Sequence, residues 1–118
     1  MKVLVTGTSS GIGRAIALKY IHEGHDVLGI DWSDSTIESE HYTHIKKDIC
    51  AKELPNIENV DILVNNAGVQ NTKDDIDINL KGTINITEKY GIQSNIKSIV
   101  FIASASASTG AEFPEYVA

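Results

Sequence analysis

The sequence predicts an α/β fold, in which a doubly wound parallel sheet of the Rossmann type lies between two layers of helices. Apolar runs at 3–5, 26–30 and 60–64 alternate with segments of helical spacing. Such continuous apolar strands are typical of a parallel sheet that is covered on both faces. Right-handed crossovers between them give the strand order 3-2-1-4-5, with the topological switch point between the first and fourth strands.

The length and charge of the chain indicate one small acidic domain over residues 1–118. Ten Lys and Arg against sixteen Asp and Glu give a net charge of −6, which argues against a nucleic-acid partner. The first apolar run is too short for a signal peptide, and no stretch approaches the length of a membrane span. Together with the single cysteine, these features favour a cytoplasmic protein that does not associate with membranes.

The first predicted strand, 3–5, runs into the glycine-rich stretch Thr6-Gly7-Thr8-Ser9-Ser10-Gly11-Ile12-Gly13. A helix follows, with its apolar positions at Ile12, Ala15, Ile16 and Tyr20. Glycines allow a tight turn and close approach of a ligand, while a helix N-terminus offers free N–H groups and about half a positive charge. The stretch therefore predicts a phosphate cradle that binds a pyrophosphate. Its expected cofactor-binding residues are Gly7, Ser9, Ser10, Gly11, Ile12 and Gly13.

Asp31 ends the second apolar run, twenty residues after Gly11. A carboxylate at this position accepts hydrogen bonds from a ribose diol, so the pair of signals predicts a dinucleotide. NAD is expected in preference to NADP because a 2′-phosphate would meet the Asp31 carboxylate. Neither Ser10 nor Trp32, the neighbouring positions where a basic residue could compensate, carries a charge.

Between the second and fourth strands the pattern is weaker. Gly24 is expected to end the first helix, and the polar residues 31–42 to form a loop with one short helix. A third strand is predicted around 43–45, and Pro55 is expected to end another short helical piece.

The second half of the chain has one long helical pattern. After the strand 60–64, residues 74–90 show helical spacing and Gly91 follows as a stop. A last strand is expected over 98–103, before a tail rich in Ser and Ala. The positions expected to face inward on the helix are Ile76, Asn79, Leu80, Thr83 and Thr87.

With these motifs the chain resembles the short-chain dehydrogenase/reductase family, and in particular its 3-oxoacyl-[acyl-carrier-protein] reductase-like members. The glycine-rich turn, Asn65-Asn66-Ala67-Gly68 and Asn79-Leu80-Lys81-Gly82 match three family motifs over residues 1–118. The resemblance implies that Asp48 and Ile49 contact an adenine. It also implies that Asn66, Ala67 and Gly68 line the ribose and hold the ends of the sheet.

The same resemblance assigns a catalytic set. It implies Asn79, Ser104 and Tyr116 as catalytic residues, with Ser106 as the alternative for the serine because the interval to Tyr116 is about one residue short. The family has a Lys four positions after its Tyr, and this chain stops two residues after Tyr116. The sequence therefore resembles the amino-terminal half of an enzyme, truncated before the last strands, and these 118 residues are expected to bind the cofactor without turnover.

Two classes of function follow. The first is an NAD(H)-dependent oxidoreductase that moves a hydride between nicotinamide and a small alcohol or ketone, and that forms a homo-oligomer as family members do. The alternative is a non-catalytic nucleotide-binding or regulatory module.

Metal binding is not expected. His41 and His44 lie near Glu38 and Glu40 in a polar surface segment and lack the i, i+4 spacing of a helical metal site. Cys50 has no basic neighbour in sequence, so an inert, half-buried thiol is expected.

Overall fold

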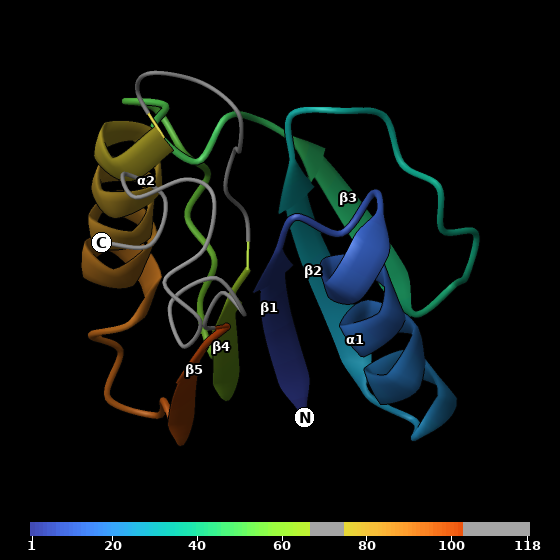
Figure 1. Cartoon of the computed structure of the whole chain (residues 1–118). Coiled ribbons are helices and arrows are strands. Elements are labelled where there is room, and N and C mark those ends of the chain that lie inside the picture. The colour runs from blue at the N-terminus through green and yellow to red at the C-terminus, as the bar shows by residue number, and fades with distance from the viewer. Residues whose placement is uncertain (67–74, 103–118) are drawn as a thin grey trace, which may run out of the picture.

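The computed structural model of the chain describes residues 1–66 and 75–102, and contains one five-stranded parallel sheet. Its strand order is β3-β2-β1-β4-β5, which confirms the predicted topology (Figure 1). The elements in chain order are β1 (Lys2–Thr6), α1 (Gly11–His22), β2 (Asp26–Asp31), β3 (Tyr42–Lys46), β4 (Ile62–Asn65), α2 (Asp75–Tyr90) and β5 (Ser98–Phe101).

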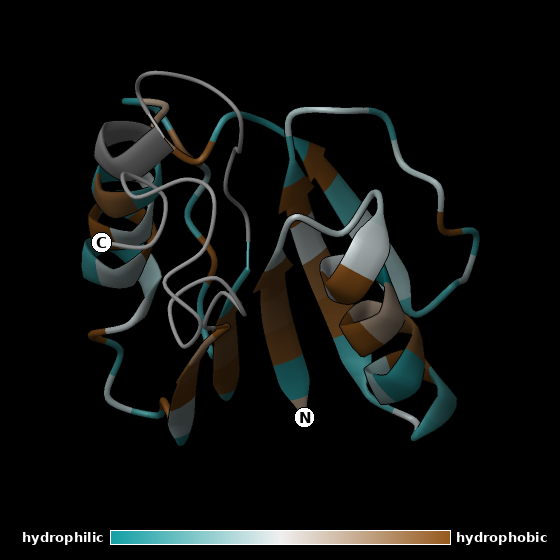
Figure 2. Cartoon of the chain, viewed as in Figure 1, coloured by the Kyte–Doolittle hydropathy of each residue, from teal (hydrophilic) through white to brown (hydrophobic). Residues whose placement is uncertain are grey.

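The two helices cover opposite faces of the sheet. Successive residues of a strand point to opposite faces, so neighbouring residues of β1 contact different helices. Val3 and Val5 of β1 pack with Ala17 of α1, whereas Leu4 between them packs with Ile86 of α2. All five side chains are fully buried. The inner strands β1, β2 and β4 are mostly buried and hydrophobic, as expected for strands that are covered on both faces (Figure 2). The outer strands β3 and β5 are more exposed.

The connections after β2 and β3 contain no helix, so the two short helices predicted there are wrong. In the first connection, Ser35 accepts a hydrogen bond from the N–H of Ile37 at 3.2 Å, and the Ile37 side chain is buried in the core beside α1. In the second, residues 47–61, Ile49 and Ile57 are buried in the core beside α2. These loops therefore cover the sheet in place of helices. Hydrogen bonds within local turns replace the backbone hydrogen bonds of a helix.

The predicted helix positions are confirmed only in part: Ile16 and Tyr20 of α1 pack against the core, and Thr83 and Thr87 of α2 are partly buried. On α1 the buried residues are Gly13 and Ala17, while Ile12 is 61% exposed and Ala15 is exposed too. On α2 the fully buried residues are Ile86 and Tyr90, while Leu80 is 56% exposed. Contact with the sheet therefore leaves Ile12 and Leu80 outside the core, although both fit the helical spacing.

The glycines predicted to end the helices lie where expected. Gly24 follows the last turn of α1 in the left-handed region, with φ of 92°, and its N–H donates to the carbonyl of Ile21 at 3.0 Å. Gly91 follows α2 directly and its N–H donates to the carbonyl of Thr87. Neither described helix is long and apolar enough to cross a membrane.

Tyr90 anchors the end of α2 to the connection after β3. Its hydroxyl donates to the carbonyl of Pro55 at 2.7 Å, and its burial raises the pKa of the phenol to about 12. This contact holds the carboxyl-terminal end of α2 against residues that precede β4.

Replacing Ile86 by Ala tests the packing of α2 on the sheet. Ile86 is completely buried, so we expect Ile86→Ala to lower the free energy of unfolding by about 2–5 kcal/mol. Ile84 on the same helix is 47% exposed and gives the matched control, for which a loss below about 1 kcal/mol is expected. Urea unfolding measures both, and equal losses would contradict the described orientation of α2.

Candidate functional site

The carboxyl ends of β1 and β4 meet at the switch point, where the sequence predicts the ligand site. Asn66, which follows β4, donates its backbone N–H to Thr6 Oγ1 at 2.9 Å and its side-chain amide to the carbonyl of Gly7 at 3.4 Å. Asn66 therefore ties the end of β4 to the glycine-rich turn. In a doubly wound sheet this edge is where ligands bind.

The three glycines of the turn have different physical tasks. Gly7 and Gly11 have φ of 75° and 58°, in the left-handed region that side chains rarely adopt. Gly13 is needed for space, because a Cβ there would overlap the Gly7 carbonyl and the Asn66 amide. Close packing of α1 on the turn depends on this missing side chain.

The N-terminus of α1 suits an anionic group. Its N-cap residue Ser10 makes no side-chain cap hydrogen bond, and the first turn contains no acidic residue. Among the described residues, no atom beyond the chain neighbours and the backbone of α1 itself lies within 4 Å of the position that a Cβ on Gly11 would take. Uncapped N–H groups and open space fit the phosphate cradle that the sequence predicts. Ser10 and Ile12 are exposed beside it.

Asp31 is buried at the end of β2, and both of its carboxylate oxygens accept backbone hydrogen bonds. Oδ2 accepts from the N–H of Ser9 at 3.0 Å, and Oδ1 accepts from the N–H of Ser33 at 2.8 Å. One side chain thus joins the glycine-rich turn to the loop after β2. Each carboxylate oxygen has a further lone pair, so the group can still accept a bond from a ribose hydroxyl.

Ser9 lies in the turn, but its hydroxyl faces the protein. It donates to the carbonyl of Asp34 at 2.8 Å, while the Ser9 carbonyl accepts from Thr36 Oγ1 at 2.7 Å. The Ser9 N–H donates to Asp31 Oδ2, so each polar group of Ser9 has a partner within the protein, and Ser9 holds the loop after β2 against the glycine-rich turn.

A second network, which the sequence analysis missed, connects the turn to the edge strand β3. Thr8 Oγ1 lies 2.6 Å from the Tyr42 hydroxyl, which in turn lies 2.7 Å from His44 Nδ1. Burial, with a smaller contribution from the charge of Asp31, raises the pKa of Tyr42. A Cβ on Gly29 of β2 would overlap both hydroxyl oxygens, so this glycine makes room for the contact.

Two cations lie on the same side of the sheet, and the loop after β2 binds both. Lys46 Nζ is 2.9 Å from Asp34 Oδ1, and this hydrogen-bonded ion pair lowers the pKa of Asp34. Arg14 in α1 donates from Nε to Thr36 Oγ1 at 3.0 Å. Both contacts are exposed.

The connection after β3 carries the residues assigned to an adenine. Asp48 is exposed, and its Oδ1 accepts the N–H of Cys50 at 2.8 Å in a local turn. The Ile49 side chain is buried in the core, against Gly82 of α2, where a Cβ would overlap it. A ligand can therefore reach Ile49 only through its backbone. Cys50 is exposed, so the half-buried thiol predicted for it is wrong.

Asn85 of α2 fastens this connection. Its side-chain amide donates to the carbonyls of Ile49 at 2.7 Å and Ala51 at 3.0 Å. The helix that carries Asn79 is thus joined directly to the predicted adenine side of the site. Asn79 itself is partly buried, six residues before Asn85. The other predicted site residues, namely Ala67, Gly68, Ser104, the alternative Ser106 and Tyr116, lie outside the described residues.

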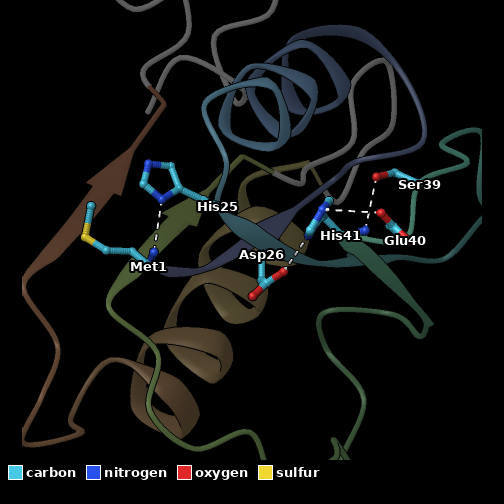
Figure 3. A network of polar contacts seen from close by, with 6 residues as sticks. All are labelled: Met1, His25, Asp26, Ser39, Glu40 and His41. Carbon is cyan, nitrogen blue, oxygen red and sulfur yellow. Dashed lines mark hydrogen bonds and ion pairs between the residues drawn. The ribbon is translucent and has the colours of Figure 1, made fainter.

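The histidines weighed as metal ligands have separate partners. His41 Nδ1 lies 3.1 Å from Asp26 Oδ1 at the amino ends of β2 and β3, and its other ring nitrogen faces Glu40 (Figure 3). His44 points instead to Tyr42 and to the Ser33 carbonyl. Within residues 1–66 and 75–102, no group of three His, Cys, Asp or Glu side chains could hold a metal ion.

The sheet order, the glycine-rich turn and the acidic residue that ends β2 define the chain as a doubly wound α/β protein of the Rossmann type. A family model described as short chain dehydrogenase matches residues 1–118. The chain belongs to this family, whose members are oxidoreductases.

Individual relatives agree with this. The chain is 29% identical to a 3-oxoacyl-[acyl-carrier-protein] reductase of Thermotoga maritima, in an alignment that covers 86% of the chain and 54% of the relative. It is 31% identical to the aldohexose dehydrogenase of Thermoplasma acidophilum, whose structure superposes with a TM-score of 0.82 over 98% of this chain and 54% of that one. The chain thus spans about half the length of these relatives.

Two more distant structures share the fold and hold different cofactors. A short chain dehydrogenase from Leptospira borgpetersenii contains bound NAD⁺ (22% identity, TM-score 0.79, 98% of this chain and 58% of that one). A serine dehydrogenase is complexed with NADP⁺ (24% identity, TM-score 0.69, 92% and 56%).

Replacing Tyr42 by Phe tests the network that joins Thr8 to β3. The change leaves the fully buried Thr8 hydroxyl without that partner, so we expect a loss of about 1–3 kcal/mol in the free energy of unfolding. Tyr20→Phe is the matched control, because its ring packs against the same core cluster, and about 0.5 kcal/mol or less is expected there. Similar values for the two variants in urea unfolding would refute the importance of the Thr8 contact.

Proposed function

We propose that the protein is an NAD(H)-dependent oxidoreductase that transfers a hydride between nicotinamide and a small alcohol or ketone. The observation that carries this proposal is the Asp31 carboxylate, which lies beside the glycine-rich turn and accepts bonds from both Ser9 and Ser33. Family membership supports the reaction class. Because the chain spans about half of its relatives, the activity, the substrate and a homo-oligomeric state of the whole protein are all part of the proposal.

The described residues fit a dinucleotide in a specific orientation. The pyrophosphate would lie at the N-terminus of α1, on the backbone N–H groups of residues 10–13. The ribose diol would donate to Asp31, and the adenine would lie near Asp48 and the backbone of Ile49. Asn66 would stay at the ends of β1 and β4, where Ala67 and Gly68 follow it.

When bound, the cofactor supplies the hydride acceptor or donor, and the chain must move the accompanying proton. We assign the proton to Tyr116, the substrate oxygen to Ser104, with Ser106 as the alternative, and a proton-relaying water to Asn79. A phenol with a pKa near 10 lies about 3 units above neutral pH, so about 4 kcal/mol of phenolate stabilisation is needed. In the family a Lys four positions after the Tyr supplies much of it.

Cofactor binding tests the first half of the proposal. Trp32 is the single tryptophan of the chain and is 73% exposed next to Asp31, so its fluorescence should report binding. We expect NAD⁺ to bind more tightly than NADP⁺. Asp31→Asn should weaken NAD⁺ binding about tenfold or more, since a hydrogen bond to a charged group contributes about 1.5–3 kcal/mol.

Asp26→Asn is the matched control, at the exposed opposite end of the same strand. It should leave the affinity for NAD⁺ within about twofold of the original, because Asp26 faces His41 and lies at the far edge of the sheet. Tighter binding of NADP⁺ than of NAD⁺ would overturn the preference. A lack of binding to either cofactor would overturn the proposal.

Turnover separates the oxidoreductase from the non-catalytic module. We expect the protein that binds NAD⁺ to oxidise at least one secondary alcohol, and Tyr116→Phe to slow that oxidation about a thousandfold, because the change removes the phenol that is assigned to the proton. Absorbance of NADH with a panel of alcohols measures both rates. Equal rates would sink the assignment to Tyr116, whereas NAD⁺ binding without any turnover would favour the module.

A further inference from the structure

A residue other than Asp31 bears on the choice between NAD and NADP, an inference that rests on the proposed function. Lys46 is the last residue of β3 and lies directly opposite Asp31 of β2 in the parallel register. Residues paired in this way point to the same face of a sheet. A cation is therefore available beside the carboxylate that is proposed to hold the ribose.

This cation is bound by Asp34, three residues after Asp31. Lys46 Nζ lies 2.9 Å from Asp34 Oδ1, and both side chains are mostly exposed, at 60% and 88%. Asp34 is held at this place by the turn itself, because its carbonyl accepts the Ser9 hydroxyl at 2.8 Å. The ion pair is thus built onto the glycine-rich turn.

The second cation on this face is bound by the same loop. Arg14 donates from Nε to Thr36 Oγ1 at 3.0 Å and from Nη2 to the Thr36 carbonyl at 3.3 Å. Thr36 also donates to the Ser9 carbonyl. The loop 32–41 therefore holds Lys46 and Arg14 against its own oxygen atoms. A 2′-phosphate on the ribose would need one of these two cations as a partner.

The charges around the ribose position then favour a cofactor without a 2′-phosphate. Asp31, Asp34 and Lys46 together carry a net charge of −1, by two carboxylates against one ammonium. Without the Asp34 charge, Lys46 would balance Asp31 and would be free to approach an anion. At about 4 Å in water, a unit charge contributes about 1 kcal/mol, which is about fivefold in affinity.

We propose that Asp34 is a specificity-determining residue, which disfavours NADP by adding a negative charge beside Asp31 and by holding Lys46. The Asp34–Lys46 ion pair acts on the cofactor's 2′-substituent and not on hydride transfer. Because it is exposed, its effect should be screened by salt.

Calorimetric titration of the purified protein with NAD⁺ and NADP⁺ tests this proposal. We expect Asp34→Asn to tighten NADP⁺ binding about five- to tenfold at low salt, and to leave NAD⁺ binding within about twofold. Adding Lys46→Gln to that variant should remove most of the gain in NADP⁺ affinity. The gain of the single variant should also be smaller in about 0.5 M salt.

Glu38→Gln is the matched control, because it removes one negative charge from an exposed position of the same loop. It should leave the ratio of the two affinities unchanged. An unchanged ratio in Asp34→Asn, or a gain that persists without Lys46, would overturn the inference while the proposed function stands. If the original protein binds neither cofactor, the proposed function fails and this inference fails with it.

Discussion

The structure of the site depends on the two backbone hydrogen bonds that Asp31 accepts. The carboxylate is buried at the end of β2, where burying a charged group is costly unless it is hydrogen-bonded. Ser9 of the glycine-rich turn and Ser33 of the following loop provide these bonds. One charge therefore fixes the turn and the loop relative to the sheet, and gives the edge at the switch point its chemical character.

Close approach between elements is the second constraint, and glycines provide it at three places. Gly13 lets α1 pack on the turn, Gly29 lets Thr8 meet Tyr42 above β2, and Gly82 lets α2 pack on Ile49. At each place a methyl group would overlap a neighbouring atom. The phosphate side, the ribose side and the adenine side of the proposed site are thus each held by a contact that excludes a side chain.

The loops that replace helices after β2 and β3 add a further property. They cover the sheet with Ile37 and Ile49. They also bring backbone polar groups to the edge of the site, whereas in a regular helix most of these groups bond to one another. The loop 32–41 binds both neighbouring cations through Asp34 and Thr36. The proposed cofactor preference therefore rests on this loop as well as on Asp31.

By itself the sequence determined the sheet order, the strands, the two long helices and the positions of the glycine-rich turn and Asp31. These features follow from apolar runs and glycines, which determine structure over a few neighbouring residues. Only the tertiary structure decided which helix faces are buried. It turned Leu80 outward and Ile86 inward, although both fit helical spacing. It also created the pairs Thr8–Tyr42 and Asp34–Lys46, whose partners are 34 and 12 residues apart. Such contacts follow from strand register, and no local pattern encodes them.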